Sequence, residues 1–198
     1  MSNPTLRALS ELPLTPAPLA ESTLVMIDCQ NTYTTGVLEL DGVEPALDEA
    51  AVLLERARVA GIPVIHIQHS DGPGSLYDIH GGSGAIVDRV APLEGEIVVV
   101  KNYPNSFVGT DLDDRLKAFG ATNLVLAGFM THMCVNSTAR GAFNLGYAPT
   151  VVAGATATRA LPGSGGDTVP AATMQVASLA ALADLFAVVV SDSAAVPA

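Results

Sequence analysis

Three reactive side chains, which together could form an activated nucleophile, occur at or just after the ends of short apolar segments. They are Asp28, Lys101 and Cys134. A carboxylate, an ammonium group and a thiol can act as base, electrostatic partner and nucleophile when a fold brings them together. Taken singly, each has a commoner role: a turn residue, a solvated cation or a buried apolar side chain. The question is therefore which elements would position all three.

Six apolar segments have the length and the β-branched content of buried strands. They occupy residues 23–27, 62–67, 97–100, 124–127, 150–153 and 186–190. The segments between them have helical signals, and helices are expected within residues 41–61, 110–120, 134–146 and 168–184. Strands that alternate with helices predict a doubly wound α/β fold, in which ligands bind beyond the carboxyl ends of the strands.

A chain of 198 residues has the usual length of one domain. Residues 1–20 contain four prolines and no apolar period, so they predict an irregular lead-in to a single domain at 21–198. Residues 71–95 are glycine-rich and too long for a routine connection, and 161–166 form a second candidate loop. We expect the longer loop to lie over the functional edge of the sheet.

The composition excludes several classes of partner. Nine basic and 20 acidic residues give a net charge of −11, which opposes binding to nucleic acid or to an anionic membrane. Every apolar stretch is shorter than the roughly 20 residues that a membrane-spanning helix needs. Two cysteines are too few for a disulfide framework and suit a reducing compartment. We therefore expect a cytoplasmic protein.

The two cysteines are expected to differ in reactivity. Cys134 lies where a helix is expected to begin, and the partial positive charge of a helix start lowers the pKa of a thiol. A neighbouring Lys would lower it further. Cys29 follows Asp28 directly on an expected strand, so it should point to the opposite side, into the core.

Three motifs surround these residues: Asp-Cys-Gln-Asn-Thr-Tyr at 28–33, Lys101 followed by Ser106 and Phe107, and Gly-Phe-Met-Thr-His-Met-Cys-Val at 128–135. In this order and spacing they resemble the isochorismatase-like cysteine hydrolases, over roughly residues 22–190. The third motif is most similar to that of bacterial members related to streptothricin hydrolase. The resemblance implies a six-stranded parallel sheet with a Rossmann-like strand order, helices on both faces, a Cys-Asp-Lys triad and no cofactor.

The resemblance also implies a role for each residue in hydrolysing an amide-like C–N bond. Cys134 would attack the carbonyl, Asp28 would take the thiol proton and pass it to the leaving nitrogen, and Lys101 would hold both by charge-assisted hydrogen bonds. Water activated by Asp28 would hydrolyse the resulting thioester. A cis peptide bond between Phe129 and Met130 is expected, with an oxyanion hole formed by the N–H groups of Met130 and Cys134.

Five further residues are candidates for contacts with the substrate. Tyr33, Phe107 and Phe129 could pack on a flat apolar molecule, although aromatic residues at element ends are commonly part of the core. His80 lies in the glycine-rich segment and could close over the substrate. Arg89, in the same segment, is the candidate for binding a substrate carboxylate.

No metal is expected. The nicotinamidase branch of the family binds a metal through an Asp-x-His pattern after the second strand, where this chain reads Gln-His-Ser-Asp at 68–71. His66 and His69 are three residues apart on or near a strand, so they would face opposite sides of it and could not share a metal. Nicotinamide is accordingly disfavoured as the substrate.

Three alternatives remain open. Hydrolysis of the vinyl ether of isochorismate would use Asp28 as an acid and would not need Cys134. A nucleotide-binding module would suit the fold class, but the chain has neither Gly-x-Gly-x-x-Gly at the first strand nor a phosphate-binding loop. A redox-sensing thiol would suit Cys134, but no Cys-x-x-Cys is present to resolve it.

A homo-oligomer, a dimer or larger, is expected from the resemblance.

Overall fold

The structure is a computed structural model and describes residues 3–198. Its centre is a six-stranded sheet in the order β3-β2-β1-β4-β5-β8, in which every neighbouring pair is parallel. The strands are β1 (Ser22–Ile27), β2 (Val64–His69), β3 (Ile97–Lys101), β4 (Asn123–Phe129), β5 (Ala148–Ala157) and β8 (Val188–Val190). All six predicted strands are therefore confirmed, together with the predicted α/β class.

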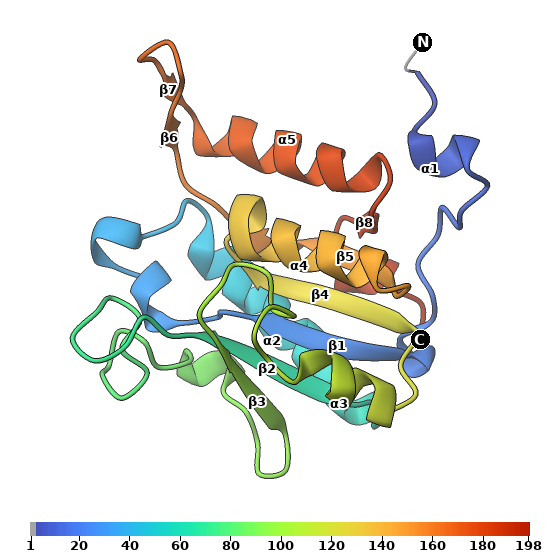
Figure 1. Cartoon of the computed structure of the whole chain (residues 1–198), viewed down its shortest axis with the longest axis horizontal. Helices are drawn as coiled ribbons and strands as arrows, with labels where there is room; N and C mark the ends of the chain where they lie inside the picture. Colours follow the sequence, from blue (N-terminus) through green and yellow to red (C-terminus); the bar gives the residue numbers. More distant parts are fainter. Residues whose placement is uncertain (1–2) are drawn as a thin grey trace.

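Helices cover both faces of the sheet (Figure 1). The five α-helices of the described chain are α1 (Leu6–Leu9), α2 (Val43–Ala60), α3 (Leu112–Ala118), α4 (Asn136–Asn144) and α5 (Ala171–Ala183). Helix α2 packs on one face, and α3, α4 and α5 supply buried residues to the other. A small antiparallel pair, β6 (Leu161–Pro162) and β7 (Thr168–Val169), extends from the sheet before α5, and the predicted 161–166 loop lies within it (Figure 1).

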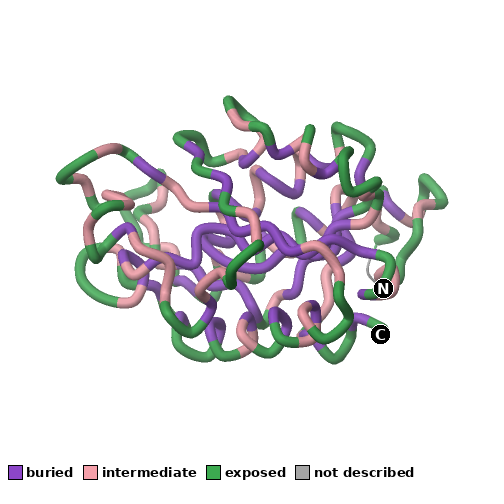
Figure 2. Tube along the Cα trace, turned by 90° about the horizontal axis from the view of Figure 1, so that it is seen from below, coloured by how far each residue is buried: buried purple, intermediate pink, exposed green. Residues whose placement is uncertain are grey.

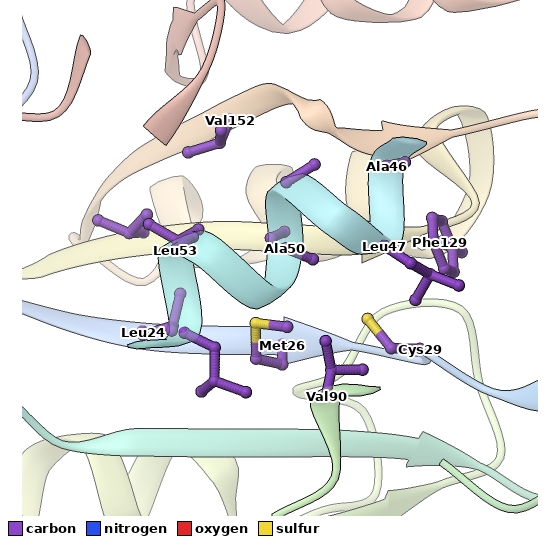
Figure 3. Close-up of a cluster of buried hydrophobic side chains, with 14 of the residues drawn as sticks. Leu24, Met26, Cys29, Ala46, Leu47, Ala50, Leu53, Val90, Phe129 and Val152 are labelled. Atoms are coloured by element: carbon purple, nitrogen blue, oxygen red, sulfur yellow. The ribbon is translucent and has the colours of Figure 1, made fainter. Parts of the chain in front are cut away.

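Strand alternation divides the core into two clusters. On β1, Leu24 and Met26 pack against α2 (Figure 3), whereas Val25 and Ile27 join the cluster beneath α3, α4 and α5. Both faces of β1 are buried, which explains its continuous apolar run. The buried part of the chain forms a central layer with exposed loops around it (Figure 2).

Residues 3–20 include a helix that the sequence did not predict. They contain α1, which begins after a Thr5 side chain that accepts the N–H of Ala8. Arg7 on this helix is 5% exposed and donates to the carbonyl oxygens of Pro13 and Leu185. The expectation of an irregular lead-in missed this helix, because the Arg7 guanidinium is satisfied in part by the Leu185 carbonyl oxygen beyond α5, a long-range contact without a local sequence signal.

The long 71–95 loop is fixed against the carboxyl end of β1. The side chain of Gln30 donates to the carbonyl oxygen of Gly84 at 2.7 Å, and Gln30 also forms an isolated bridge with Ile86. Gly84 lies so close to Asp78 that a Cβ there would come within 2.3 Å of the Asp78 carbonyl oxygen. The loop is therefore tightly folded beside the residues that follow β1.

An ion-pair cluster lies at the amino-terminal end of β3, on the opposite edge of the sheet from the carboxyl ends of the strands. Glu96 accepts two hydrogen bonds from Arg58 of α2 at 2.8 and 2.9 Å and lies 2.9 Å from Nε2 of the buried His66. Hydrogen bonding to Arg58 is the main reason that the pKa of Glu96 falls from its usual 4.5 to about 2. A depression of this size corresponds to about 3 kcal/mol of stability.

This cluster predicts a specific pH dependence of folding. Because the pKa of Glu96 is depressed in the folded state, its contribution is complete above its usual value of 4.5 and is lost as the pH falls toward about 2. Glu96→Gln should lower the free energy of unfolding at pH 7 by about 2–3 kcal/mol, and the difference from the wild type should shrink on acidification. Urea unfolding at several pH values measures this. The control is Glu94→Gln at an exposed neighbour; equal effects of both changes would contradict the assignment.

Candidate active site

Asp28 lies in an unusual turn that directly follows β1. Its N–H still donates to the carbonyl oxygen of Ile67 at 3.0 Å, but its φ of +49° takes the chain out of the strand. Beyond this turn Cys29 lies in the cluster packed against α2, as predicted (Figure 3). The Asp28 side chain is fully buried, and its Oδ1 has no hydrogen-bond partner among the described residues. One carboxylate oxygen is thus free to accept a proton.

Lys101 ends β3 and lies at the centre of the candidate site. Its Nζ is 2.6 Å from Oδ2 of Asp28, 3.4 Å from Sγ of Cys134 and 3.0 Å from Nδ1 of His69. Strand alternation places Lys101 on the same face as Val99, whose cluster also contains Cys134. The ammonium group has no exposed surface. The three residues predicted to converge at the sheet edge therefore do so.

Cys134 lies in a single π-helical turn, Thr131–Val135, that leads into α4. The turn follows β4, whose last residues pass very close to β1: a Cβ on Gly128 would come 1.9 Å from the carbonyl oxygen of Ile27. Glycine is required there, because its φ of +118° and this close approach exclude a side chain. The approach brings the Cys134 turn directly beside the end of β1.

The electrostatics of Cys134 differ from the sequence prediction. Burial, followed by the negative charge of Asp28, raises the pKa of its thiol to about 12, and Lys101 opposes this increase. The predicted lowering by a helix start was wrong for the resting site, because a thiol that is 5% exposed beside a carboxylate is costly to ionise. Burial likewise raises the pKa of Asp28, against the opposing effect of Lys101.

The segment before Cys134 has the expected backbone geometry. The peptide bond between Phe129 and Met130 is cis. The carbonyl oxygen of Met130 accepts the N–H groups of Met133 and Val135, at 3.0 and 3.3 Å, whereas no acceptor is found for the N–H of Met130 itself within residues 3–198. A free backbone donor therefore lies in the segment that leads to the thiol.

The aromatic candidates have the contacts of core residues. Tyr33 and Phe129 pack edge to face with ring centroids 5.9 Å apart, and neither exposes more than 1% of its surface. Phe107 is partly buried and stacks on Tyr147 at 6.0 Å. Burial, followed by the negative charge of Asp28, raises the pKa of the Tyr33 hydroxyl. Contact of these aromatics with a substrate stays a prediction.

Arg89 does not reach the site. Its guanidinium is paired with the carboxylates of Glu44 and Asp48 of α2, both at 2.6 Å, on the outer surface of that helix. The prediction of a carboxylate-binding Arg89 was therefore wrong, since these acids on another element already occupy the guanidinium. His80 is exposed in the 71–95 loop, where its N–H donates to Asp78 at 3.0 Å, and its contact with a substrate stays a prediction.

Two residues near the site were missed as functional candidates. His69 was considered only as a metal ligand, yet it contacts Lys101. The signal was available, because His69 and Lys101 end neighbouring strands and are register partners. The second is Arg159, which follows β5. Each of the other eight lysines and arginines has a hydrogen bond or ion pair, whereas none is found for Arg159 in the described chain and its Nε is buried.

The histidines are arranged as the strand geometry predicted. His66 points to Glu96 and His69 to Lys101, on opposite sides of β2. Among residues 3–198, no group of three or more histidine, cysteine or acidic side chains is arranged to hold a metal ion.

Removing either of the two charges beside Cys134 should shift the pKa of its thiol, and the two removals should shift it in opposite directions. Asp28→Asn removes a group that raises the pKa of Cys134, so alkylation of Cys134 by iodoacetamide should have a lower pH midpoint. Lys101→Met removes the group that lowers the pKa, so the midpoint should rise. Peptide mapping by mass spectrometry separates Cys134 from Cys29, whose pKa is also raised by burial. Shifts of the same sign in both variants would contradict the described electrostatics.

Comparison with known proteins identifies the family. The isochorismatase domain model matches residues 22–194. The secreted isochorismatase effector Isc1 of Verticillium dahliae is 35% identical over 187 residues, which cover 94% of this chain and 96% of the relative. The ureidoacrylate amidohydrolase RutB of Stutzerimonas stutzeri is 34% identical over 186 residues, 74% of this chain and 75% of the relative.

The predicted similarity to streptothricin hydrolase is also found. That enzyme of Streptomyces noursei is 35% identical over 176 residues, which cover 88% of this chain and 63% of the longer relative. Among solved structures, an isochorismatase from Pseudomonas putida KT2440 superposes with a TM-score of 0.94 at 37% identity, covering 98% of this chain and all of that one. The chain therefore belongs to the isochorismatase family and is a hydrolase of that family.

Proposed function

We propose that the protein is a cofactor-independent cysteine hydrolase that cleaves an amide-like C–N bond of a small molecule. The observation that carries this proposal is the position of Lys101, whose ammonium contacts both a buried carboxylate and a buried thiol, at 2.6 and 3.4 Å. A nucleophile, a base and a balancing cation then lie in one desolvated cluster. The amidohydrolase named among its relatives supports this reaction class.

The first half of the proposed reaction forms a thioester. The thiol of Cys134 is protonated at rest, so Asp28 must remove the proton as sulfur attacks the carbonyl carbon. Asp28 is suited to this because its Oδ1 has no other hydrogen-bond partner among the described residues. The same proton then passes to the leaving nitrogen when the C–N bond breaks, which releases ammonia or an amine.

The second half regenerates the enzyme. A water molecule loses a proton to Asp28 as it attacks the thioester, and the proton returns to the sulfur of Cys134 when the acid product departs. Lys101 stabilises the negative charge on oxygen or sulfur throughout. The proposed oxyanion hole consists of the N–H groups of Met130 and Cys134; the absence of an acceptor for the Met130 N–H within residues 3–198 supports its part in it.

We propose Arg159, in place of Arg89, as the residue that binds a carboxylate on the substrate. It follows Thr158, whose hydroxyl lies 2.5 Å from Nδ1 of His132, two residues before Cys134. Burial lowers the pKa of His132, and the positive charge of Arg159 adds to this effect. A buried N–H without a partner among the described residues is costly unless a ligand satisfies it.

A second candidate reaction is hydrolysis of the vinyl ether of isochorismate. The names of the Verticillium dahliae relative and the Pseudomonas putida structure favour it. That reaction needs Asp28 as an acid and does not need a thiol. Replacement of Cys134 should therefore spare it, whereas amide hydrolysis should fail without either residue.

Location and assembly are proposals that the reaction does not depend on. The two cysteines are free, which supports a cytoplasmic location, although one relative is named as secreted. Within residues 3–198, no helix is both long and apolar enough to cross a membrane. Self-association into a dimer or larger assembly is proposed from the family resemblance.

The reaction class is tested by an ammonia-release screen. The panel contains primary amides, ureas, lactams and carbamoyl compounds, each with and without a carboxylate. Cys134→Ser should lower the turnover of a hit by roughly 10³-fold or more, and Asp28→Asn by about 10²–10⁴-fold. Isochorismate is assayed in parallel with the same variants. Full amide turnover by Cys134→Ser would contradict the thioester route.

The specificity proposal is tested on any acidic substrate that the screen identifies. Arg159→Gln should raise the KM for that substrate by about 10–100-fold, because a hydrogen bond to a charged group contributes about 1.5–3 kcal/mol. The KM for a neutral amide should change little. Arg89→Gln is the matched control and should have no effect, because its partners are Glu44 and Asp48. An effect confined to Arg89→Gln would reverse the assignment.

A further inference from the structure

The side chain of His69 has a contact that the proposed reaction does not use. Its Nδ1 lies 3.0 Å from Nζ of Lys101, and its Nε2 lies 3.1 Å from Oδ1 of Asp71. An ammonium group can only donate, so Nδ1 must offer a lone pair to Lys101. The proton of the neutral ring is then on Nε2, where the Asp71 carboxylate accepts it. Asp71 therefore selects the tautomer that can bind Lys101.

His69 is held in place from several directions. Its backbone N–H and carbonyl oxygen pair with the side-chain amide of Gln30, both at 2.9 Å. The ring of Tyr77 packs edge to face on the imidazole with centroids 4.8 Å apart. The imidazole is 12% exposed, whereas Asp71 is 51% exposed. The ring is thus fixed, and the carboxylate that orients it is in reach of solvent.

An ammonium group has three N–H donors, and Lys101 has three acceptors around it: Asp28, Cys134 and His69. Since Lys101 has no exposed surface, water does not replace a missing acceptor at low cost. Loss of the third acceptor would leave a buried N–H unpaired and would let the ammonium rotate away from the sulfur. The direction of the other two donors therefore depends on His69.

We propose that His69, oriented by Asp71, is a positioning residue that directs the Lys101 ammonium toward Asp28 and Cys134. Only the expected effect of His69 on turnover rests on the proposed function. Its effect on the thiol needs no substrate, because Lys101 contacts Cys134 in the resting site. The two readouts can therefore fail separately.

The test compares His69→Leu with His69→Asn. Leucine removes the acceptor, whereas the amide oxygen of asparagine can occupy the place of Nδ1. His69→Leu should lower kcat by about 10–100-fold with a smaller change in KM, as expected for a misplaced catalytic group, and should slow iodoacetamide alkylation of Cys134 about as much. His69→Asn should recover most of both losses. Thermal unfolding of each variant shows whether the fold is retained.

A spectroscopic measurement on the wild type tests the inference without either His69 variant. Nitrogen-15 NMR of the His69 imidazole should show the proton on Nε2, and Asp71→Ala should weaken that preference. A wild-type Nδ1–H tautomer would overturn the proposal. So would unchanged kcat and alkylation in a folded His69→Leu, or an equal loss in a folded His69→Asn. Altered alkylation without turnover of any substrate would instead refute the proposed function and keep the positioning role.

Discussion

The ion pair between Lys101 and Asp28 is the interaction on which the rest of the site depends. Both groups are excluded from solvent, and breaking such a pair by removing one partner typically costs about 3–5 kcal/mol. The two buried charges are satisfied because β1, β2 and β3 end at one edge of the sheet, where side chains from different strands form hydrogen bonds and ion pairs with one another. The close approach of β4 to β1 at Gly128 then adds the thiol to the same buried cluster.

Burial also determines how the charges are distributed. The thiol and the carboxylate both resist ionisation, and Lys101 opposes the effect in both. In the proposed reaction, one proton moves between these two groups, which compete for a single cation. Such a pair exchanges a proton readily once a carbonyl carbon takes the electrons of sulfur. A thiolate stabilised permanently by the helix start, as the sequence suggested, is a different resting state.

The sequence was sufficient for the strands and for the three residues at their ends. Continuous apolar runs mark buried parallel strands, and parallel strands share an edge, so Asp28, Lys101 and Cys134 could be placed together without coordinates. Long-range partners could not be predicted in this way. Arg89 pairs with acids of α2, and Arg7 donates to the carbonyl oxygen of Leu185 beyond α5. The pKa of Cys134 depends on burial, which no local pattern encodes.

The resting protonation state of Cys134 tests the central claim most directly. Ultraviolet absorbance reports thiolate, and the difference between the wild type and Cys134→Ser across a pH titration isolates this one residue. The described site predicts no thiolate at neutral pH and a rise only well above the usual range of cysteine, because burial and Asp28 raise its pKa to about 12. A clear thiolate signal at neutral pH would contradict a base that must remove the proton during attack.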